Sequence, residues 1–383
     1  MTDIENFEKL KIKLVTSKKD LLDFLKVPFF VYGTEDAWAP PLLFERKLAL
    51  QPSQPIFQHL EWQGFTVYKA DQPVGRISAQ VDKFYSEKHG GKTGFFGFLE
   101  AQNDTKIFKL LFESAESWLK KKGVEHIIGP FSLNINQEIG SLIKGFETPP
   151  FFMMPNGKTY YANNLESHGY EKTIDLFAYL IKSNFRPPKL MVKILKKLPP
   201  SVYTRSINRK NLNIELETIR NIFNDAWSDN WGFLPFTKEE FSSIGREMLS
   251  IIPSDFIQIA FLDEEPVAFI VLLPNLNEVT ADLNGKLLPI GWLKLIYRLK
   301  IKYPKSGRIP LMGVRKKFHD TTLGPGLALK VVDALREPGM RKGVEDVEMS
   351  WILESNSAMS NIIKILGGTL SKTYRLYKKD IEK

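Results

Sequence analysis

The stretch GVRKKFHDTTLGPGLALKVVDALR, residues 313–336, combines residue types that can bind phosphate. It joins the end of an apolar run to apolar residues at helical spacing, and between them lie basic residues and two glycines, Gly324 and Gly326. A helix N-terminus presents free amide groups and partial positive charge, and glycines let the backbone approach a phosphate closely. The pattern predicts a strand, a phosphate-binding turn and a helix, but a surface turn without a ligand has the same local composition.

We expect the phosphate-binding residues to come from the strand end, the turn and the start of the helix. They are Gly313, Val314, Arg315, Lys316, Thr322, Leu323, Gly324, Gly326 and Leu327. Lys317 adds charge, and Pro325 suits a turn or the first helical position because of its fixed φ. Whether this is a phosphate-binding turn or a surface turn without a ligand depends on the helices and strands around it.

The composition restricts the chemistry. A chain of 383 residues that is 43% hydrophobic predicts two domains. The absence of cysteine excludes disulfides, thiol nucleophiles and cysteine-ligated metals, and the five histidines form no metal-ligand pair, so we expect no metal site. The N-terminus lacks the apolar core of a signal peptide. The sequence also contains no run of about 18 apolar residues, which is the length needed to span a membrane. We expect a cytoplasmic protein.

The net charge of +9 is concentrated in two segments. Residues 182–210 contain nine Lys or Arg and no acid, and residues 286–317 contain ten and no acid. Such runs are typical of solvated loops, and also of surfaces that bind phosphates, acidic lipids or nucleic acid.

The chain shows signs of an internal duplication. Three pairs of similar segments follow one another in the same order in both halves: 72–76 with 265–269, 121–136 with 341–356, and 168–181 with 367–381. Their offsets differ, which fits insertions such as residues 145–161 in the first half.

Both halves predict the same series of elements. A helix-rich opening (5–50; 213–250) precedes two strands in hairpin order, a third strand, a long amphipathic helix, a strand, a short helix and a final strand. This mixture predicts an α/β fold with α+β layers, each domain a mixed, mostly antiparallel sheet flanked by helices. We place the first domain at 1–184, a basic linker with an amphipathic helix at 185–212, and the second domain at 213–383.

This order of elements resembles the GNAT N-acyltransferase superfamily. In that superfamily a turn of the pattern Gln/Arg-x-x-Gly-x-Gly/Ala holds the pyrophosphate of acyl-CoA, and TTLGPGLA (321–328) is similar to it, with Thr321 at the Gln/Arg position. Residues 353–379 resemble its later strand, helix and closing strand. The first half has no Gly-x-Gly after residues 94–101, so we expect a degenerate copy that shapes the acceptor site or packs on the second half.

Three further runs resemble a narrower bacterial family of tandem GNAT-like proteins: NDAWSDNWGFLPFT (224–237), LLPNLNE (272–278) and GFFGFLEAQND (94–104). That family includes, or lies near, N-acyltransferases of long-chain lipid amines such as bacterial ceramide synthases. The resemblance implies transfer of an acyl group from acyl-CoA or an acyl carrier protein to an amine. It implies no permanently bound cofactor, and it points to Asn230, Trp231, Asn277 and Glu278 as substrate-binding residues.

Direct attack of an amine on a thioester needs a neutral amine, a polarised carbonyl and a proton for the leaving thiolate. The resemblance points to a tyrosine of the last strand as the acid, either Tyr374 or Tyr377. The candidates for the base are Glu354 with its neighbour Asn356, then Asn277, Glu278 and Asp282, and His319 by its chemistry alone. Asn356 can equally cap the short helix that follows it.

Two segments predict contact with a membrane. On a helix, residues 286–303 place Leu288, Trp292, Leu295, Ile296, Leu299 and Tyr303 on one face and Lys294, Arg298 and Lys302 on another. Residues 189–198 have a similar character. Basic amphipathic helices with aromatic residues bind anionic bilayers, which would place the protein at the inner membrane face. The other interpretation is that both apolar faces pack on the domains.

Two other functions fit parts of the sequence. In an aminoacyl-tRNA-dependent transferase the basic segments would contact phosphates, although few aromatic residues accompany them and nucleic acid is the less favoured partner. In a non-catalytic module that binds acyl-CoA or lipid, both halves would be degenerate, and Thr321 favours that function.

Overall fold

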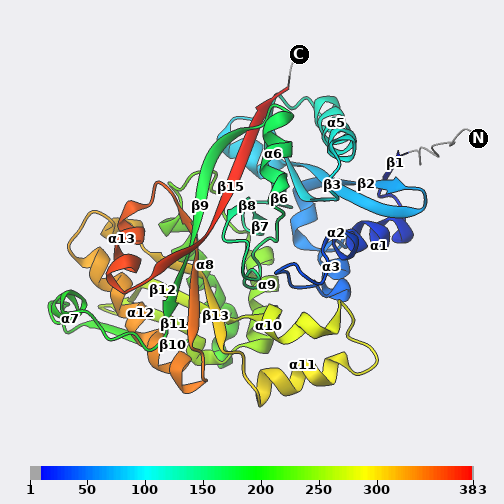
Figure 1. Cartoon of the computed structure of the whole chain (residues 1–383). Coiled ribbons are helices and arrows are strands. Elements are labelled where there is room, and N and C mark those ends of the chain that lie inside the picture. The colour runs from blue at the N-terminus through cyan, green and yellow to red at the C-terminus, as the bar shows by residue number, and fades with distance from the viewer. Residues whose placement is uncertain (1–9, 382–383) are drawn as a thin grey trace, which may run out of the picture. The chain divides into compact units, whose positions relative to one another are not determined.

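A computed structural model describes residues 10–381 (Figure 1). The chain divides into two compact units. The first contains the described residues up to Asp175, together with Leu283–Leu287 and the residues from Tyr374 onward. The second contains Leu176–Asp282 and Leu288–Thr373. The start of the helix-rich opening predicted at 5–50 lies outside the described residues, and Leu10–Leu14 form a strand.

The first unit is built on one mixed sheet. Its strand order is β1 (Leu10–Leu14), β2 (Leu60–Lys69), β3 (Gln72–Asp82), β4 (Thr93–Ala101), β5 (His126–Gly129) and the end of β15 (Thr369–Asp380). Its short strands are β6 (Phe131–Ser132), β7 (Glu138–Ile139) and β8 (Ser141–Lys144). Its helices are α1 (Lys18–Lys26), α2 (Pro28–Val31), α3 (Leu43–Ala49), η1 (Pro55–Gln58), α4 (Lys83–His89), α5 (Thr105–Lys121) and α6 (Tyr160–Ser167).

The second unit repeats this order. Its strands are β10 (Val202–Ser206), β11 (Ile257–Leu262), β12 (Glu265–Pro274), β13 (Ser306–Val314), β14 (Asp346–Leu353) and the end of β9 (Glu171–Lys182). Its larger helices are α7 (Lys189–Leu195), α8 (Leu212–Ala226), α9 (Lys238–Ile251), α11 (Gly291–Lys300), α12 (Leu323–Arg341) and α13 (Ser357–Ile365). Its short helical turns are η2 (Arg209–Asn211), η3 (Ser254–Phe256), α10 (Leu276–Thr280), η4 (Ala281–Leu283) and η5 (Lys316–Phe318).

The long helix of each unit packs on its sheet through an apolar face. In α5 the buried side chains recur at helical spacing: Ile107, Phe108, Leu111, Phe112, Ala115 and Leu119. They join the core formed by the inner face of β2, β3 and β4. In the second unit α12 buries Leu327, Val331 and Leu335 in the same way. These two helices confirm the periodicity predicted from the sequence.

Each unit receives its sixth strand from the other half of the sequence. Residues Tyr377–Asp380 of β15 pair antiparallel with β5, and Leu176–Lys182 of β9 pair antiparallel with β14. The strand orders β1-β2-β3-β4-β5-β15 and β10-β11-β12-β13-β14-β9 therefore correspond position by position. The two halves exchange their last strands.

Candidate functional site

Strands β13 and β14 of the second unit form a fork. Their parallel pairing covers only Ser306–Ile309 and Asp346–Met349. Pro310 follows the last paired residue and has no N–H to continue the ladder. On its other side β13 stays paired with β12 as far as Val314. We call residues 310–314 and 350–353, beyond the last pair, the fork.

A buried polar network lies where the fork begins. The guanidinium Nε of Arg308 donates to Ser350 Oγ at 2.8 Å, and Ser350 Oγ donates to Glu348 Oε1 at 2.7 Å. All three residues are at most 2% exposed. Burial raises the pKa of Glu348, and this effect outweighs the opposing influence of Arg308, of the Ser350 hydrogen bond and of Lys372.

The second oxygen of Glu348, Oε2, is buried and has no hydrogen-bond partner among the described residues. It can therefore accept a proton or a further hydrogen bond. The sequence analysis missed this residue. Its only signal there is one acid inside the apolar strand VEMSWIL, and that signal does not reveal the register that pairs it with Arg308.

The predicted phosphate turn follows the end of β13. His319 Nε2 lies 2.7 Å from the carbonyl oxygen of Val314, and Thr321 Oγ1 accepts a hydrogen bond from the amide of Leu323 at 3.2 Å. Thr322, the N-cap of α12, makes no side-chain capping bond. In the described part of the chain the amides of Thr322 and Gly324 have no acceptor. Two free amides thus lie at the N-terminus of a 19-residue helix.

The glycines of this turn fit closely against the protein itself. A Cβ at Gly324 would lie 2.3 Å from the carbonyl oxygen of Phe318. A Cβ at Gly326 would lie 2.6 Å from the side chain of Leu198. The first contact is with rigid backbone and the second with a side chain that can move. Packing therefore accounts for both glycines, whether or not a phosphate binds.

The basic residues of the turn already have acidic partners. Lys316 Nζ lies 2.5 Å from Asp229, and its amide donates to Asp225 at 2.8 Å. Lys317 contacts Glu265 at 2.6 Å, and Arg315 Nε donates to the carbonyl of Pro266. The predicted excess of positive charge is locally compensated, so an anion would have to exchange with these carboxylates.

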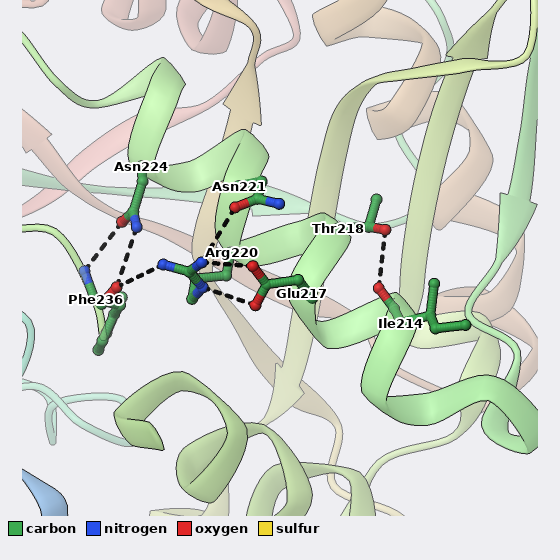
Figure 2. Close-up of polar contacts among 7 residues, drawn as sticks. All are labelled: Ile214, Glu217, Thr218, Arg220, Asn221, Asn224 and Phe236. Atoms are coloured by element: carbon green, nitrogen blue, oxygen red, sulfur yellow. Dashed lines mark hydrogen bonds and ion pairs between the residues drawn. The ribbon is translucent and has the colours of Figure 1, made fainter. Parts of the chain in front are cut away.

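The loop that carries Asn230 and Trp231 is fixed beside β13. Trp227 Nε1 donates to the carbonyl oxygen of Met312 at 2.9 Å. At the other end of the loop, the side-chain amide of Asn224 makes two hydrogen bonds with the backbone of Phe236, at 3.0 and 3.1 Å (Figure 2). Together with the contacts of Asp225 and Asp229, these bonds bring this loop and the phosphate turn together.

Other predicted residues of the second unit have structural contacts. Glu278 accepts hydrogen bonds from the amides of Lys305 and Ser306, at 2.9 and 3.1 Å, at the start of β13. Asn356 caps α13 by accepting from the amide of Met359 at 3.0 Å. Glu354 is exposed just after β14, and Asn277 lies half-buried in α10.

The two candidate tyrosines belong to the first unit. Tyr374 and Tyr377 have no exposed surface. Burial and the charge of Glu166 raise the pKa of Tyr377 to about 12. The strand beside β14 is β9 instead, where Tyr179 pairs with Met349. The sequence did not reveal this exchange.

The first unit has a corresponding fork that its own chain fills. Pairing between β4 and β5 ends at Phe95 and Ile128. A Cβ at Gly97 would lie 1.6 Å from the carbonyl oxygen of Phe131, which also accepts a hydrogen bond from Gln80. At the N-terminus of α5, Asp104 accepts from the amide of Lys106 at 2.8 Å. A carboxylate at this position repels phosphate, whereas the start of α12 carries no carboxylate cap and only the neutral hydroxyl of Thr321 accepts there.

Two units with the same strand order, each with a forked parallel pair followed by a long helix, define the tandem GNAT fold. The structure is similar to a tandem GNAT protein from the clavulanic acid biosynthesis pathway, solved without acetyl-CoA, with a TM-score of 0.58 and 13% identity over 97% of this chain and 98% of that one. No protein-family model matches the chain.

Two proteins are similar over nearly the whole sequence. Protein YghO of Escherichia coli (strain K12) is 45% identical over 100% of this chain and 98% of its own length. Bacterial ceramide synthase of Caulobacter vibrioides (strain NA1000 / CB15N) is 40% identical over 97% of both chains. The chain belongs to the family of these two proteins, and it is an N-acyltransferase.

Proposed function

We propose that the chain transfers an acyl group from acyl-CoA, or from an acyl carrier protein, to the amine of a long-chain lipid such as a sphingoid base. The N-terminus of α12, which follows the fork, carries this proposal because the free amides of Thr322 and Gly324 suit the donor's phosphates. The relative named bacterial ceramide synthase supports a lipid amine as the acceptor.

In this reaction the amine nitrogen attacks the thioester carbonyl carbon within the fork. The C–N bond forms, the C–S bond breaks, and the nitrogen loses one proton while the thiolate gains one. Glu348 would take the proton from nitrogen through the hydroxyl of Ser350, which passes its own proton to Oε1 of Glu348 as it receives the proton of the amine. Tyr374 and Tyr377 stay the predicted acids, and Glu354 and Asn356 stay alternatives for the base.

Lipid mass spectrometry of cells that express the protein tests the proposal. With sphinganine and other long-chain amines in the medium, we expect a new N-acyl lipid that is absent from cells expressing Gly324→Glu. Equal expression of both chains is the control. If well-expressed protein produces no new lipid, a lipid amine is not the acceptor. Salt-sensitive tRNA binding would then favour the aminoacyl-tRNA function, and acyl-CoA binding without turnover would favour a binding module.

We further propose that α11 docks this enzyme on an anionic bilayer. The helix and its flanks expose a group of large apolar side chains: Leu288, Ile290, Trp292, Leu293, Ile296, Tyr297 and Ile301. Leu295 and Leu299 are only partly exposed, so the outward face differs from the predicted one. No helix among residues 10–381 is long and apolar enough to cross a membrane. A helix of this kind lies at the bilayer surface, with its aromatic residues at the level of the headgroups.

The cations around α11 divide into two groups. Lys294 and Arg298 contact Asp282 at 3.2 and 2.5 Å, so they fix the helix to the protein. Lys300 and Lys302 are exposed, and within the described chain their side chains make no ion pair, so they suit anionic headgroups. In the other predicted segment, residues 189–198, Leu198 packs against Gly326, whereas Leu190 and Val192 are exposed, so this segment stays a second candidate for bilayer contact.

The Ile296→Glu variant should bind vesicles containing phosphatidylglycerol about tenfold more weakly, because a charge replaces an apolar group that enters the bilayer. Sedimentation with vesicles measures this. The matched control is Ile214→Glu, an equally apolar and 69% exposed isoleucine on α8, which should bind like the unaltered chain. Equal binding by both variants would show that α11 does not contact the bilayer.

A further inference from the structure

The wall of a cavity of about 230 Å³ in the first unit contains none of the groups assigned to acyl transfer. The residues that matter in its wall are Tyr32, Asp36, Phe146, Asn156, Lys158 and Tyr160. Both Asn156 and Lys158 come from the insertion at residues 145–161, which the second half lacks. The cavity therefore has no counterpart that the duplication would explain.

Asp36 and Tyr32 form a cage around the ammonium group of Lys158. Lys158 Nζ lies 2.5 Å from Asp36 Oδ1 and 5.2 Å from the centre of the Tyr32 ring. A carboxylate with an aromatic face is the arrangement that binds primary ammonium groups. Burial alone would raise the pKa of Asp36, but the hydrogen bonds from Lys158 and from the amide of Gly33 lower it, so Asp36 is a carboxylate.

The cage is rigid because each wall has a second contact. The carboxylate of Asp36 accepts from the amide of Gly33 at 2.6 Å. The ring of Tyr32 stacks on Trp38 at 4.9 Å, and its hydroxyl donates to the buried carboxyl of Glu100 at 2.8 Å. A site whose side chains are held by their neighbours loses little entropy when a ligand enters.

The cavity also offers an acceptor that is not used. Asn156 Oδ1 is buried and has no hydrogen-bond partner among the described residues. Lys158 and Asp36 keep 20% and 28% of their side-chain surface exposed, so the ammonium group of Lys158 can leave the cage toward solvent. A ligand with one ammonium group and a nearby hydroxyl could satisfy both Asp36 and Asn156.

We propose that this cavity is a second ligand site, specific for a small primary amine that bears a hydroxyl group, and that Lys158 occupies it as an internal competitor. The ligand's ammonium group displaces that of Lys158 from Asp36 and Tyr32, and its hydroxyl donates to Asn156 Oδ1. The choice of an amino alcohol rests on the proposed function, because it matches the polar end of a sphingoid base.

Calorimetric titration of the full chain with 2-amino-1,3-propanediol tests the site. Lys158→Met removes the competing charge and should tighten binding about fivefold. Asp36→Asn removes the carboxylate and should weaken binding about tenfold. The compound without the amine, 1,3-propanediol, should not bind. A purely structural Lys158–Asp36 pair predicts no gain from Lys158→Met, and that result, or equal binding of both compounds, would overturn the proposal.

Acyl-CoA binding by the same samples separates this proposal from the proposed function. All variants should bind acyl-CoA unchanged, which also shows that they are folded. If the amine does not bind, or binds equally to the unaltered chain and to Lys158→Met, while acyl transfer is normal, only the proposed amine site in the cavity is contradicted. If Lys158→Met tightens amine binding and Asp36→Asn weakens it, in a chain that acylates no lipid, the amine site is supported and only the proposed acyl transfer to a lipid is contradicted.

Discussion

Replacing Gly324 with glutamate should abolish acyl-CoA binding. A Cβ at this position would lie 2.3 Å from the carbonyl oxygen of Phe318, which is backbone that cannot move aside without opening the turn. The new carboxylate would also lie beside the free amides of Thr322 and Gly324, where it would act as a cap and repel phosphate. Fluorescence titration with an acyl-CoA measures the loss.

The control for this variant is Gly326→Ala. Its Cβ would come within 2.6 Å of the end of the Leu198 side chain, which can rotate, and would lie at ordinary contact distance, 3.6 Å, from Ile194. Binding by Gly326→Ala should therefore stay near that of the unaltered chain. A Gly324→Glu chain that melts normally and binds acyl-CoA normally would place the donor outside this turn.

Replacing Glu348 with glutamine should reduce kcat by about 100-fold or more while acyl-CoA still binds, because a positioned proton acceptor is worth that factor. The pH profile identifies the cause. Burial raises the pKa of Glu348, so its carboxylate is present above that raised pKa and is lost as the pH falls through it. Activity of the unaltered enzyme should fall on the acidic side at a pH above the usual range for glutamate.

The Glu348→Gln variant should lose this acidic limb. The Ser350→Ala variant should lower kcat and move the limb to higher pH, because it removes a hydrogen bond that lowers the pKa of Glu348. Rates measured between about pH 5 and about pH 9 cover the range. A Glu348→Gln chain with full kcat would exclude Glu348 from proton transfer. An unchanged acidic limb in a slow variant would assign a different base, with Glu354 the next candidate.

The sequence predicted those parts of the molecule that local spacing determines. The apolar repeat of α5 and α12 and the tandem GNAT-like organisation are both confirmed. The glycine turn was found where a strand ends and a helix begins because both signals are contiguous in the chain.

Contacts between distant segments could not be predicted. The ion pairs of Lys316 with Asp229 and of Lys317 with Glu265 join residues far apart in sequence, and they compensate the positive charge of the turn locally, which a count of basic residues does not reveal. Glu348 and Arg308 meet only because two strands pair in a particular register. A duplicated pattern gives the same strand order whether each half keeps or exchanges its last strand, so the position of Tyr377 beside β5 could not be inferred.

The exchange of strands governs how this protein can be synthesised. Strand β5 pairs with Tyr377–Asp380, which the ribosome adds only after the residues of the second unit. The sheet of the first unit therefore cannot be completed before the second unit has been synthesised, although N-terminal domains usually fold first, and one edge of that sheet stays open until then. Neither half can be produced alone as a complete domain. A stop codon that removes only β15 would leave the sheet of the first unit without the strand that pairs with β5.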